Sequence, residues 1–316
     1  MPLRATRPVL IRPLRDFLAT ESAGGIALVG AALLALLWAN SPWQESYRQL
    51  WETVIDLRLG SLSLTLDLRQ FVNEALMTIF FLVVGLEIKR EIVEGELRDA
   101  SRRALPVFAA IGGMIIPALI YAGINFGMPE VRGWGIPMAT DIALAVGVMT
   151  LAGNVRPALK IFLLALAIVD DIGAILVIGV FYAGHIELGW IGAGCVAVAL
   201  VVVLQKRRVD VLWVYVTVGS GLWLALHEAG IHATLTGVIL GFLAPTKPYL
   251  SKELIDDSEL TKLDSARDAE ITTRLARSAV SVVEWLEHRL HPWTSFLVVP
   301  IFAFANAGIS LSAESL

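Results

Sequence analysis

A succession of long apolar runs is the feature that most restricts what this chain can fold into. A helix that crosses a bilayer needs about 20 mostly apolar residues, and runs of that kind recur along the sequence. They predict nine membrane-spanning helices, near residues 23–40, 71–88, 104–126, 133–152, 157–183, 187–205, 210–227, 230–246 and 292–310. The composition agrees, because 56% of the 316 residues are hydrophobic and 17% are charged, whereas soluble domains are about 25% charged. We therefore expect an all-α polytopic membrane protein.

Several other classes of protein are excluded by simple features of the chain. The net charge of −4 offers no basic surface for nucleic acid. The single cysteine, Cys195, cannot form an intramolecular disulfide. The apolar stretch from Gly24 to Ala39 is long for a signal peptide, and a poor cleavage site follows it at residues 40–42, so we interpret it as a retained span.

The basic residues predict how these spans are oriented. Cytoplasmic loops of membrane proteins carry an excess of Lys and Arg. If the N-terminus is cytoplasmic, 21 of the 25 basic residues lie on the cytoplasmic side. The four outside are Arg48, Arg58, Arg69 and Arg132. We expect the N-terminus inside and the residues after the ninth span outside.

Two loops carry further information. Leucines alternate on both sides of Gly60-Ser61, which predicts a periplasmic β-hairpin over about residues 53–69. Its open edges could pair with another chain in a dimer, or the hairpin could rest on its own helices. The segment 247–290 is strongly charged and is expected to be a cytoplasmic loop, with a solvated helical connector as the simplest interpretation. No second soluble domain is evident, so residues 1–316 are expected to form a single membrane domain.

Three carboxylates in the predicted spans point to function. A charged side chain at the bilayer centre costs about 2.5–3.5 kcal/mol to insert, yet Asp141 lies in the fourth span and Asp170 and Asp171 lie midway along the fifth. Two adjacent carboxylates in a medium of low dielectric constant repel each other, which raises the pKa of at least one. Such a pair can be doubly charged around a cation or neutralised by protons. A group that binds either Na⁺ or H⁺ is the minimum that exchange requires. The alternative is a protonated pair that makes hydrogen bonds between helices.

The surroundings of Asp141 predict an interrupted helix. Pro137, preceded by Gly133 and Gly135, weakens helical continuity before Thr140-Asp141. Either Thr140 or Asp141 suits the N-cap of the half-helix that follows, and Asp141 could be no more than that cap. The functional interpretation is that a broken helix at membrane depth lines a cavity, because exposed backbone polar groups are not tolerated in lipid.

Weaker features leave alternatives open. The segment from Glu87 to Glu91 closes the second span and could be snorkelling charge or a proton-sensing cluster. His227 and His232 have an unconvincing spacing for a metal site. His288 and His291 could be polar residues at an interface. We find no phosphate-binding loop, no nucleophile elbow and no Cys–His metal pattern.

Five motifs and one further segment carry a family resemblance. The motifs are Ala-Thr140-Asp141-Ile-Ala-Leu-Ala, Leu-Ala-Ile-Val-Asp170-Asp171-Ile-Gly-Ala, Val-Gly-Leu-Glu87-Ile-Lys-Arg90-Glu91, Gly-Ile-His232-Ala-Thr-Leu and Leu-Glu287-His288-Arg-Leu-His291-Pro-Trp. The further segment is Phe302-Ala-Phe-Ala-Asn-Ala-Gly308. Together they resemble bacterial NhaA-type sodium/proton antiporters, and the match runs in order from about residue 11 to 311.

The resemblance implies a homodimeric antiporter of the bacterial inner membrane that exports Na⁺ or Li⁺ and admits protons, with no cofactor. Asp171 then corresponds to the main ion-binding carboxylate, Asp170 to its proton-carrying neighbour, and Asp141 with Thr140 to the crossing of broken helices. Positions tied to pH-dependent activation correspond to Glu87, Arg90, Glu91, His232, Glu287 and His291. The hairpin at 53–69 corresponds to the dimer contact.

The resemblance also carries an expectation about length. The family has a twelve-helix fold built from inverted repeats, whereas the nine predicted spans here omit the last three helices and the lysine of the tenth. The alternative functions are therefore a non-transporting fragment or an assembly subunit. A remote alternative is an intramembrane aspartyl protease, which also needs two acids on neighbouring helices but carries Gly-x-Gly-Asp or Tyr-Asp motifs that are absent here.

Overall fold

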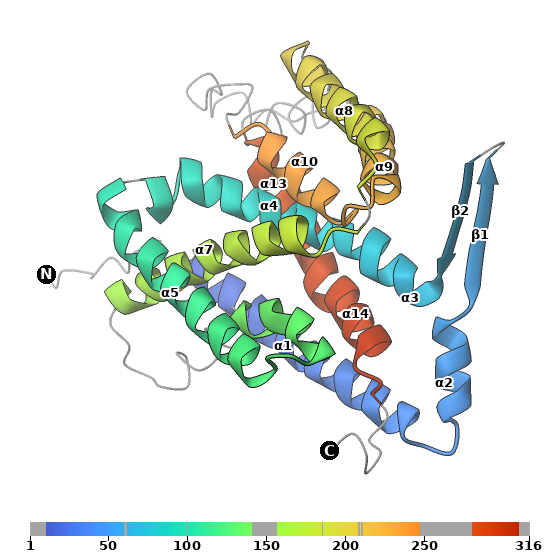
Figure 1. Cartoon of the computed structure of the whole chain (residues 1–316). Coiled ribbons are helices and arrows are strands. Elements are labelled where there is room, and N and C mark those ends of the chain that lie inside the picture. Colours follow the sequence, from blue (N-terminus) through green and yellow to red (C-terminus); the bar gives the residue numbers. More distant parts are fainter. Residues whose placement is uncertain are drawn as a thin grey trace, which may run out of the picture. The chain divides into compact units, whose positions relative to one another are not determined.

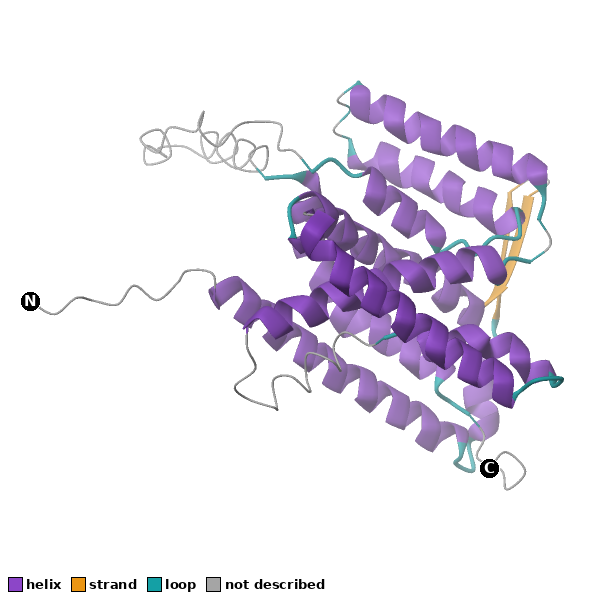
Figure 2. Cartoon of the chain, turned by 60° about the vertical axis from the view of Figure 1, so that its left-hand side comes forward, coloured by secondary structure: helices purple, strands orange, loops and turns teal. Residues whose placement is uncertain are grey.

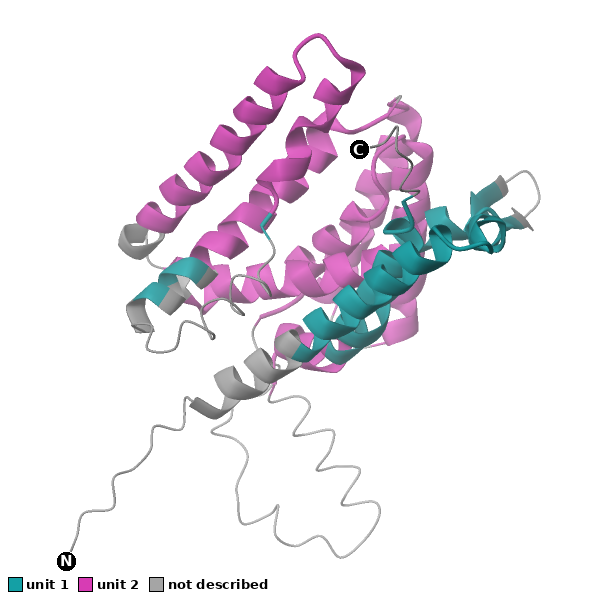
Figure 3. Ribbon diagram, turned by 90° about the horizontal axis from the view of Figure 1, so that it is seen from below, with its two compact units in different colours: residues 1–73, 140–164, 292–316 teal, residues 74–139, 165–291 magenta. Residues whose placement is uncertain are grey.

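Helices dominate the computed structural model, which describes residues 11–59, 62–98, 100–140, 157–184, 186–207, 209, 211–246 and 280–309 (Figures 1 and 2). The chain divides into two compact units, each of which is described by itself (Figure 3). Unit 1 comprises residues 1–73, 140–164 and 292–316, and unit 2 comprises residues 74–139 and 165–291.

Unit 1 is built on the long first helix. Its elements are α1 (Ile11–Ala39), α2 (Gln44–Trp51), strands β1 (Val54–Leu59) and β2 (Leu62–Asp67), α3 (Leu68–Phe71), the π-helical turn η5 (Thr294–Val298) and α14 (Val299–Asn306). Helix α1 packs along η5 and α14. At Gly24 the helices approach closely, because a Cβ there would lie 3.2 Å from the Cβ of Ser295. Segments from the two ends of the chain therefore form one layer.

Helix α2 is amphipathic and turns sharply away from α1, with a bend of 118° between residues 23–39 and 44–51. Its buried side carries Tyr47 and Trp51, whose rings meet Phe304 of α14 edge-on at centroid distances of 6.1 and 5.8 Å. The Tyr47 hydroxyl donates to the Phe304 carbonyl at 2.7 Å.

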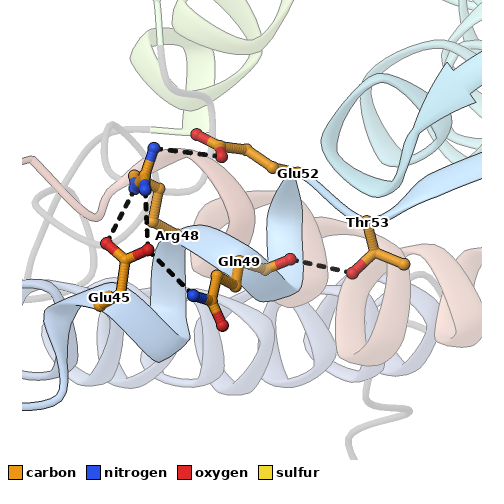
Figure 4. A network of polar contacts seen from close by, with 5 residues as sticks. All are labelled: Glu45, Arg48, Gln49, Glu52 and Thr53. Atoms are coloured by element: carbon orange, nitrogen blue, oxygen red, sulfur yellow. Dashed lines mark hydrogen bonds and ion pairs between the residues drawn. The ribbon is translucent and has the colours of Figure 1, made fainter.

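The opposite side of α2 is polar. Arg48 lies between Glu45 and Glu52, with Nη–Oε distances of 2.7 and 3.3 Å (Figure 4). The Gln49 amide donates to Glu45 at 2.9 Å, and the Thr53 hydroxyl donates to the Gln49 carbonyl. An apolar side on the protein and a charged side away from it are expected for a helix at a surface.

Strands β1 and β2 pair antiparallel over the segment in which the hairpin was predicted. In the backbone register Leu57 pairs with Leu64 and Leu59 with Leu62. An N-terminal capping box then starts α3: Asp67 accepts from the Gln70 N–H at 2.6 Å, and the Gln70 side chain accepts from the Asp67 N–H. The periplasmic position of these strands stays a prediction.

The other helices that the structure describes lie wholly or partly in unit 2. They are the π-helical turn η1 (Val72–Leu76), of which residues 74–76 belong to this unit, α4 (Met77–Val93), the 3₁₀ turn η2 (Glu96–Arg98), α5 (Ala100–Ile124), the 3₁₀ helix η3 (Pro129–Met138), α7 (Pro157–Phe181, from residue 165), α8 (Leu188–Lys206), α9 (Leu212–Glu228), α10 (Leu235–Leu243) and α13 (Val282–Trp293, to residue 291).

Helices α4 and α10 pack closely in unit 2, and glycines make this close approach possible. A Cβ at Gly241 would lie 2.7 Å from the Gly85 carbonyl carbon, and one at Gly237 would collide with the Thr78 carbonyl oxygen. Backbones at this separation gain van der Waals contact that larger residues would prevent, which is how membrane helices commonly associate. The Gly237 and Gly241 spacing is therefore used for packing.

The outer surfaces of several helices are apolar, as a lipid environment requires. On α5 the exposed side chains include Phe108 (74%), Leu119 (66%) and Ile124 (71%). By length and hydropathy, three of the described helical segments could cross a membrane: Leu68–Val93, Ala104–Ile124 and Leu188–Lys206. A fourth exists if α1 and α2 are taken together. The chain is thus an apolar helical protein, and nine remains a predicted number of spans.

Three predicted spans differ from the helices observed. The span at 230–246 contains only α10, because Gly230 (φ +75°) ends α9 in a Schellman motif, with the Ile231 N–H donating to the Leu226 carbonyl at 3.0 Å. The described part of 133–152 is 3₁₀ helix to Met138 and then extended. The helix predicted to begin at 292 begins at Val282 and continues through Pro292 into η5.

Candidate functional site

The two adjacent carboxylates of α7 are the centre of the candidate site. Asp170 is 2% exposed, and Asp171 is half-buried. Successive residues of an α-helix point about 100° apart, so the two side chains leave the helix in different directions. One neighbour on a single face cannot serve both.

Close packing surrounds this part of α7. A Cβ at Gly173 would collide with the sulfur of Met114 on α5, and one at Gly179 would lie 3.1 Å from Leu235 of α10. Glycines therefore let α7 lie against both neighbours in unit 2. The nearby Ala167 and Ile168 are buried, so Asp170 has apolar surroundings on its own helix.

The third predicted carboxylate, Asp141, lies outside the described residues. Thr140 is exposed at the end of the extended residues that follow η3. Among the residues that the structure describes, no group of three or more His, Cys, Asp or Glu side chains is arranged to hold a metal ion. The pair Asp170 and Asp171 is the described part of the predicted ion site.

The structure brings Arg90 and Glu287 together. Arg90 Nη1 lies 2.6 Å from Glu287 Oε1, and Glu287 is 7% exposed. Burial raises the pKa of the Glu287 carboxyl, while the charges of Arg90 and of His291 one turn further on α13 act to lower it. Glu87 and Glu91 share α4 with Arg90.

His232 lies apart from this ion pair. It is exposed in the link between α9 and α10, before the first turn of α10. The last turn of α10, at the opposite end of that helix, lies near the part of α4 that carries Arg90. There Lys89 Nζ donates to the Phe242 carbonyl at 2.9 Å, and Gln205 donates to the Leu243 carbonyl at 2.9 Å. The nine residues of α10 separate the two ends by about 13 Å.

Several contacts within unit 2 join residues that the predicted topology places on one side of the membrane, and that topology stays a prediction. On the side predicted to be outside, the Gly184 N–H donates to the Gly230 carbonyl at 2.7 Å, and the Glu187 N–H donates to the Ala229 carbonyl at 3.2 Å. The ion pair of Arg90 with Glu287 joins two residues predicted to be inside. Residues expected on one side of the membrane therefore meet one another.

One polar cluster was missed by the sequence reasoning. Glu74 Oε2 on η1 lies 2.7 Å from His227 Nδ1 on α9. The Trp223 ring stacks on His227 at 5.3 Å, and its indole N–H donates to the Glu74 carbonyl at 3.2 Å. The available signal in the sequence is Glu74 itself, an acid near the start of the predicted span at 71–88. The spacing of His227 to His232 bears only on a metal site and gives no hint of a contact with Glu74.

A second missed group is Tyr182, directly after α7. Its hydroxyl donates to the Arg132 carbonyl at 2.7 Å and accepts from the Gly135 N–H at 2.9 Å. No sequence motif indicates this contact, because it joins residues that are far apart in the chain.

These features define a class: a helical membrane protein with buried carboxylates among apolar, closely packed helices. The family model described as Na⁺/H⁺ antiporter 1 matches residues 15–316. The chain belongs to this family.

Similar proteins carry matching names. The chain is 46% identical to Na(+)/H(+) antiporter NhaA 2 of Sorangium cellulosum (strain So ce56), with 98% of this chain and 70% of that protein covered. It is 43% identical to Na(+)/H(+) antiporter NhaA 2 of Myxococcus xanthus (strain DK1622), covering 96% and 68%. It is 42% identical to Na(+)/H(+) antiporter NhaA of Rhodopirellula baltica (strain DSM 10527 / NCIMB 13988 / SH1), covering 97% and 72%. The predicted family is thereby confirmed.

Proposed function

We propose that this protein is a Na⁺/H⁺ antiporter that exports Na⁺ and admits H⁺ by alternating access. Its family consists of secondary transporters rather than enzymes, which removes the intramembrane protease from consideration. The observation that carries the mechanism is the adjacent pair on α7, with Asp170 almost fully buried and Asp171 half-buried.

The pair supports exchange by competition. Two neighbouring carboxylates with little water around them repel when both are ionised, so the doubly charged state needs a cation. When protons bind instead, the same site is neutral and Na⁺ leaves. Asp171 is the main Na⁺ ligand in this proposal, Asp170 the neighbouring proton carrier, and Asp141 with Thr140 a nearby part of the site. Na⁺ and H⁺ are the substrates.

Regulation by pH is a further part of the proposal. The residues involved are Glu87, Arg90, Glu91, His232, Glu287 and His291. Support comes from Glu287, a buried carboxyl whose pKa is raised by burial and which is paired with Arg90. A change in its charge alters the contact between α4 and α13. His232 acts separately, because it is about one length of α10 away from the last turn of that helix.

Membrane placement and assembly are proposed on sequence grounds. We place the protein in the bacterial inner membrane with a cytoplasmic N-terminus. Residues 1–316 form one transporter domain that belongs to the inverted-repeat antiporter fold, and Li⁺ is an alternative substrate. The open edges of β1 and β2 support a homodimer through residues 53–69.

Everted membrane vesicles test the proposal. Respiration establishes an acidic lumen, and addition of Na⁺ is expected to release protons and reduce the pH gradient. Asp171→Asn should abolish this response, and Asp170→Asn should abolish or strongly reduce it. Glu187→Gln, the matching removal of charge from an exposed carboxyl just before α8, should leave the response intact. An undiminished response in Asp171→Asn vesicles would contradict the mechanism.

A further inference from the structure

Tyr182 ties together two segments that lead to the proposed carboxylates. It is the first residue after α7, and its side chain reaches back to η3. The hydroxyl donates its proton to the Arg132 carbonyl at 2.7 Å and accepts from the Gly135 N–H at 2.9 Å. A hydroxyl offers one donor and two acceptor positions, so one oxygen fixes two points of the η3 backbone.

Aromatic contacts strengthen the same junction. The Trp134 ring meets Phe181 edge-on at 5.3 Å and lies tilted against Tyr182 at 6.2 Å. Aromatic pairs with these geometries contribute beyond the area they bury. Two hydrogen bonds and two ring contacts thus attach residues 132–135 to the end of α7.

The glycines on either side of Trp134 have a specific role in this junction. A Cβ at Gly135 would lie 2.9 Å from the Tyr182 hydroxyl, and a Cβ at Gly133 would lie 2.8 Å from the Tyr121 hydroxyl. Both distances are shorter than real Cβ contacts allow. Gly135 therefore gives the Tyr182 hydroxyl access to the η3 backbone, and Gly133 leaves room for the Tyr121 hydroxyl.

Chain connectivity shows which parts of the proposed site this junction joins. Thr140, the last described residue before Asp141 in the sequence, comes two residues after Met138, so η3 leads directly into the part of the chain that carries Asp141. Tyr182, which directly follows α7, lies about 16 Å along the helix axis from Asp171. The Tyr182 hydroxyl therefore connects the segment that precedes Asp141 to the helix that carries Asp170 and Asp171.

We infer that Tyr182 is a positioning residue for ion exchange, which acts through the contact between η3 and α7 and touches neither ion. This inference rests on the proposed function. Without the Tyr182 hydroxyl, the segment that precedes Asp141 can shift relative to α7. Ion affinity depends on how the carboxylates are placed, whereas the rate of the conformational cycle depends on the helices as a whole. The apparent KM for Na⁺ is therefore the quantity that should change.

The experiment compares two Tyr→Phe variants in proteoliposomes, with Na⁺-dependent proton efflux recorded over a range of Na⁺ concentrations. Tyr182→Phe keeps the ring and removes both hydrogen bonds to η3. Tyr47→Phe removes a hydroxyl that also donates to a backbone carbonyl at 2.7 Å, that of Phe304, but lies within unit 1. We expect Tyr182→Phe to raise the apparent KM for Na⁺ about fivefold, the size expected for about one hydrogen bond, with the maximal rate within about twofold of wild type.

Two variants compared with Tyr182→Phe decide the outcome. Tyr47→Phe should lower the melting temperature about as much as Tyr182→Phe while keeping the wild-type KM. Gly135→Ala, which displaces the hydroxyl without changing Tyr182, should raise the KM in the same direction and covers the case in which Tyr182→Phe does not fold. A wild-type KM in a folded Tyr182→Phe protein, or an equal shift in Tyr47→Phe, would overturn the inference. Antiport in the wild type with an unchanged KM in Tyr182→Phe refutes only the positioning role, whereas absence of antiport in the wild type refutes the proposed function.

Discussion

Arg90 on α4 and Glu287 on α13 form an ion pair of 2.6 Å between helices that are far apart in the sequence. Arg90 is 39% exposed by its side chain, whereas Glu287 is 9% exposed, so the pair has one solvated and one buried partner. Within the described residues, the second carboxyl oxygen of Glu287 has no hydrogen-bond partner. Removing a carboxylate from water favours its neutral form, and this effect exceeds the opposing effect of Arg90 on the Glu287 pKa.

Glu287→Gln is expected to change how stability depends on pH. Because the folded state raises the Glu287 pKa above its ordinary value of 4.5, the wild type gains stability from this group below about pH 4.5 and loses it as pH rises through the raised pKa. The melting temperature of the wild type relative to Glu287→Gln should therefore fall as pH rises above about 4.5. Thermal unfolding in detergent from pH 4 to 9 measures it.

The control for this experiment is Glu94→Gln, which removes an exposed carboxyl just after α4. Its melting temperatures should follow those of the wild type across the range. Parallel curves for Glu287→Gln and wild type, or a wild type that gains relative stability with pH, would show that burial does not dominate at Glu287.

Gly237→Ala should destabilise the protein strongly. The new Cβ would collide with the Thr78 carbonyl of α4, which is backbone and cannot rotate away. Inserting a methyl group into a contact of this kind costs about 1–3 kcal/mol or more. Gly221→Ala on α9 is the matched control, because nothing lies within 4 Å of its Cβ position, and helix propensity favours it by up to about 1 kcal/mol. Melting temperatures of the two variants should move in opposite directions, and equal shifts would contradict the packing explanation.

The sequence predicted the class of fold well because apolar runs and turn residues are local signals. The antiparallel strands on both sides of Gly60-Ser61 lie where leucine alternation indicated them. Helix lengths were harder to predict. The run 230–246 is apolar throughout, but its first residues belong to a turn begun by Gly230, and α10 is only nine residues long. Hydropathy indicates whether a segment prefers an apolar environment, but it does not show where the helix within that segment begins.

For the candidate site, the sequence identified residue types but not most of their partners. Asp170 and Asp171 were found because charge is costly in apolar surroundings. Glu287 and Arg90 were named through resemblance, and their pairing depends on how α4 and α13 pack. The sequence does not predict the contacts of Tyr182 and Glu74, because a tertiary contact leaves no periodic pattern in the chain.

Glu74 and His227 should show measurable coupling. Their 2.7 Å contact is supported by Trp223, which stacks on the imidazole and donates to the Glu74 carbonyl. Both side chains are about a quarter exposed (28% and 25%), so solvent reduces the energy of the pair to about 1 kcal/mol. A double-mutant cycle with Glu74→Gln and His227→Gln, read from unfolding at pH 6, should give a coupling energy of that size. Strictly additive effects would mean that the contact adds nothing to stability.

Asn73 and Asn306 are expected to behave as a unit. Each amide nitrogen donates to the other's oxygen, at 3.1 and 2.7 Å, and Asn306 also donates to the Phe302 carbonyl at 2.8 Å. Within unit 1, the pair joins Asn73, at the start of η1, to the last turn of α14. Replacing either residue with Ala removes both reciprocal bonds and leaves the other amide to find water, at a cost of about 1 kcal/mol. The double variant loses little more, because no unpaired partner remains. Unfolding free energies of the two single variants and the double variant should therefore show clear non-additivity, and a double variant equal to the sum of the singles would show that the two amides act independently.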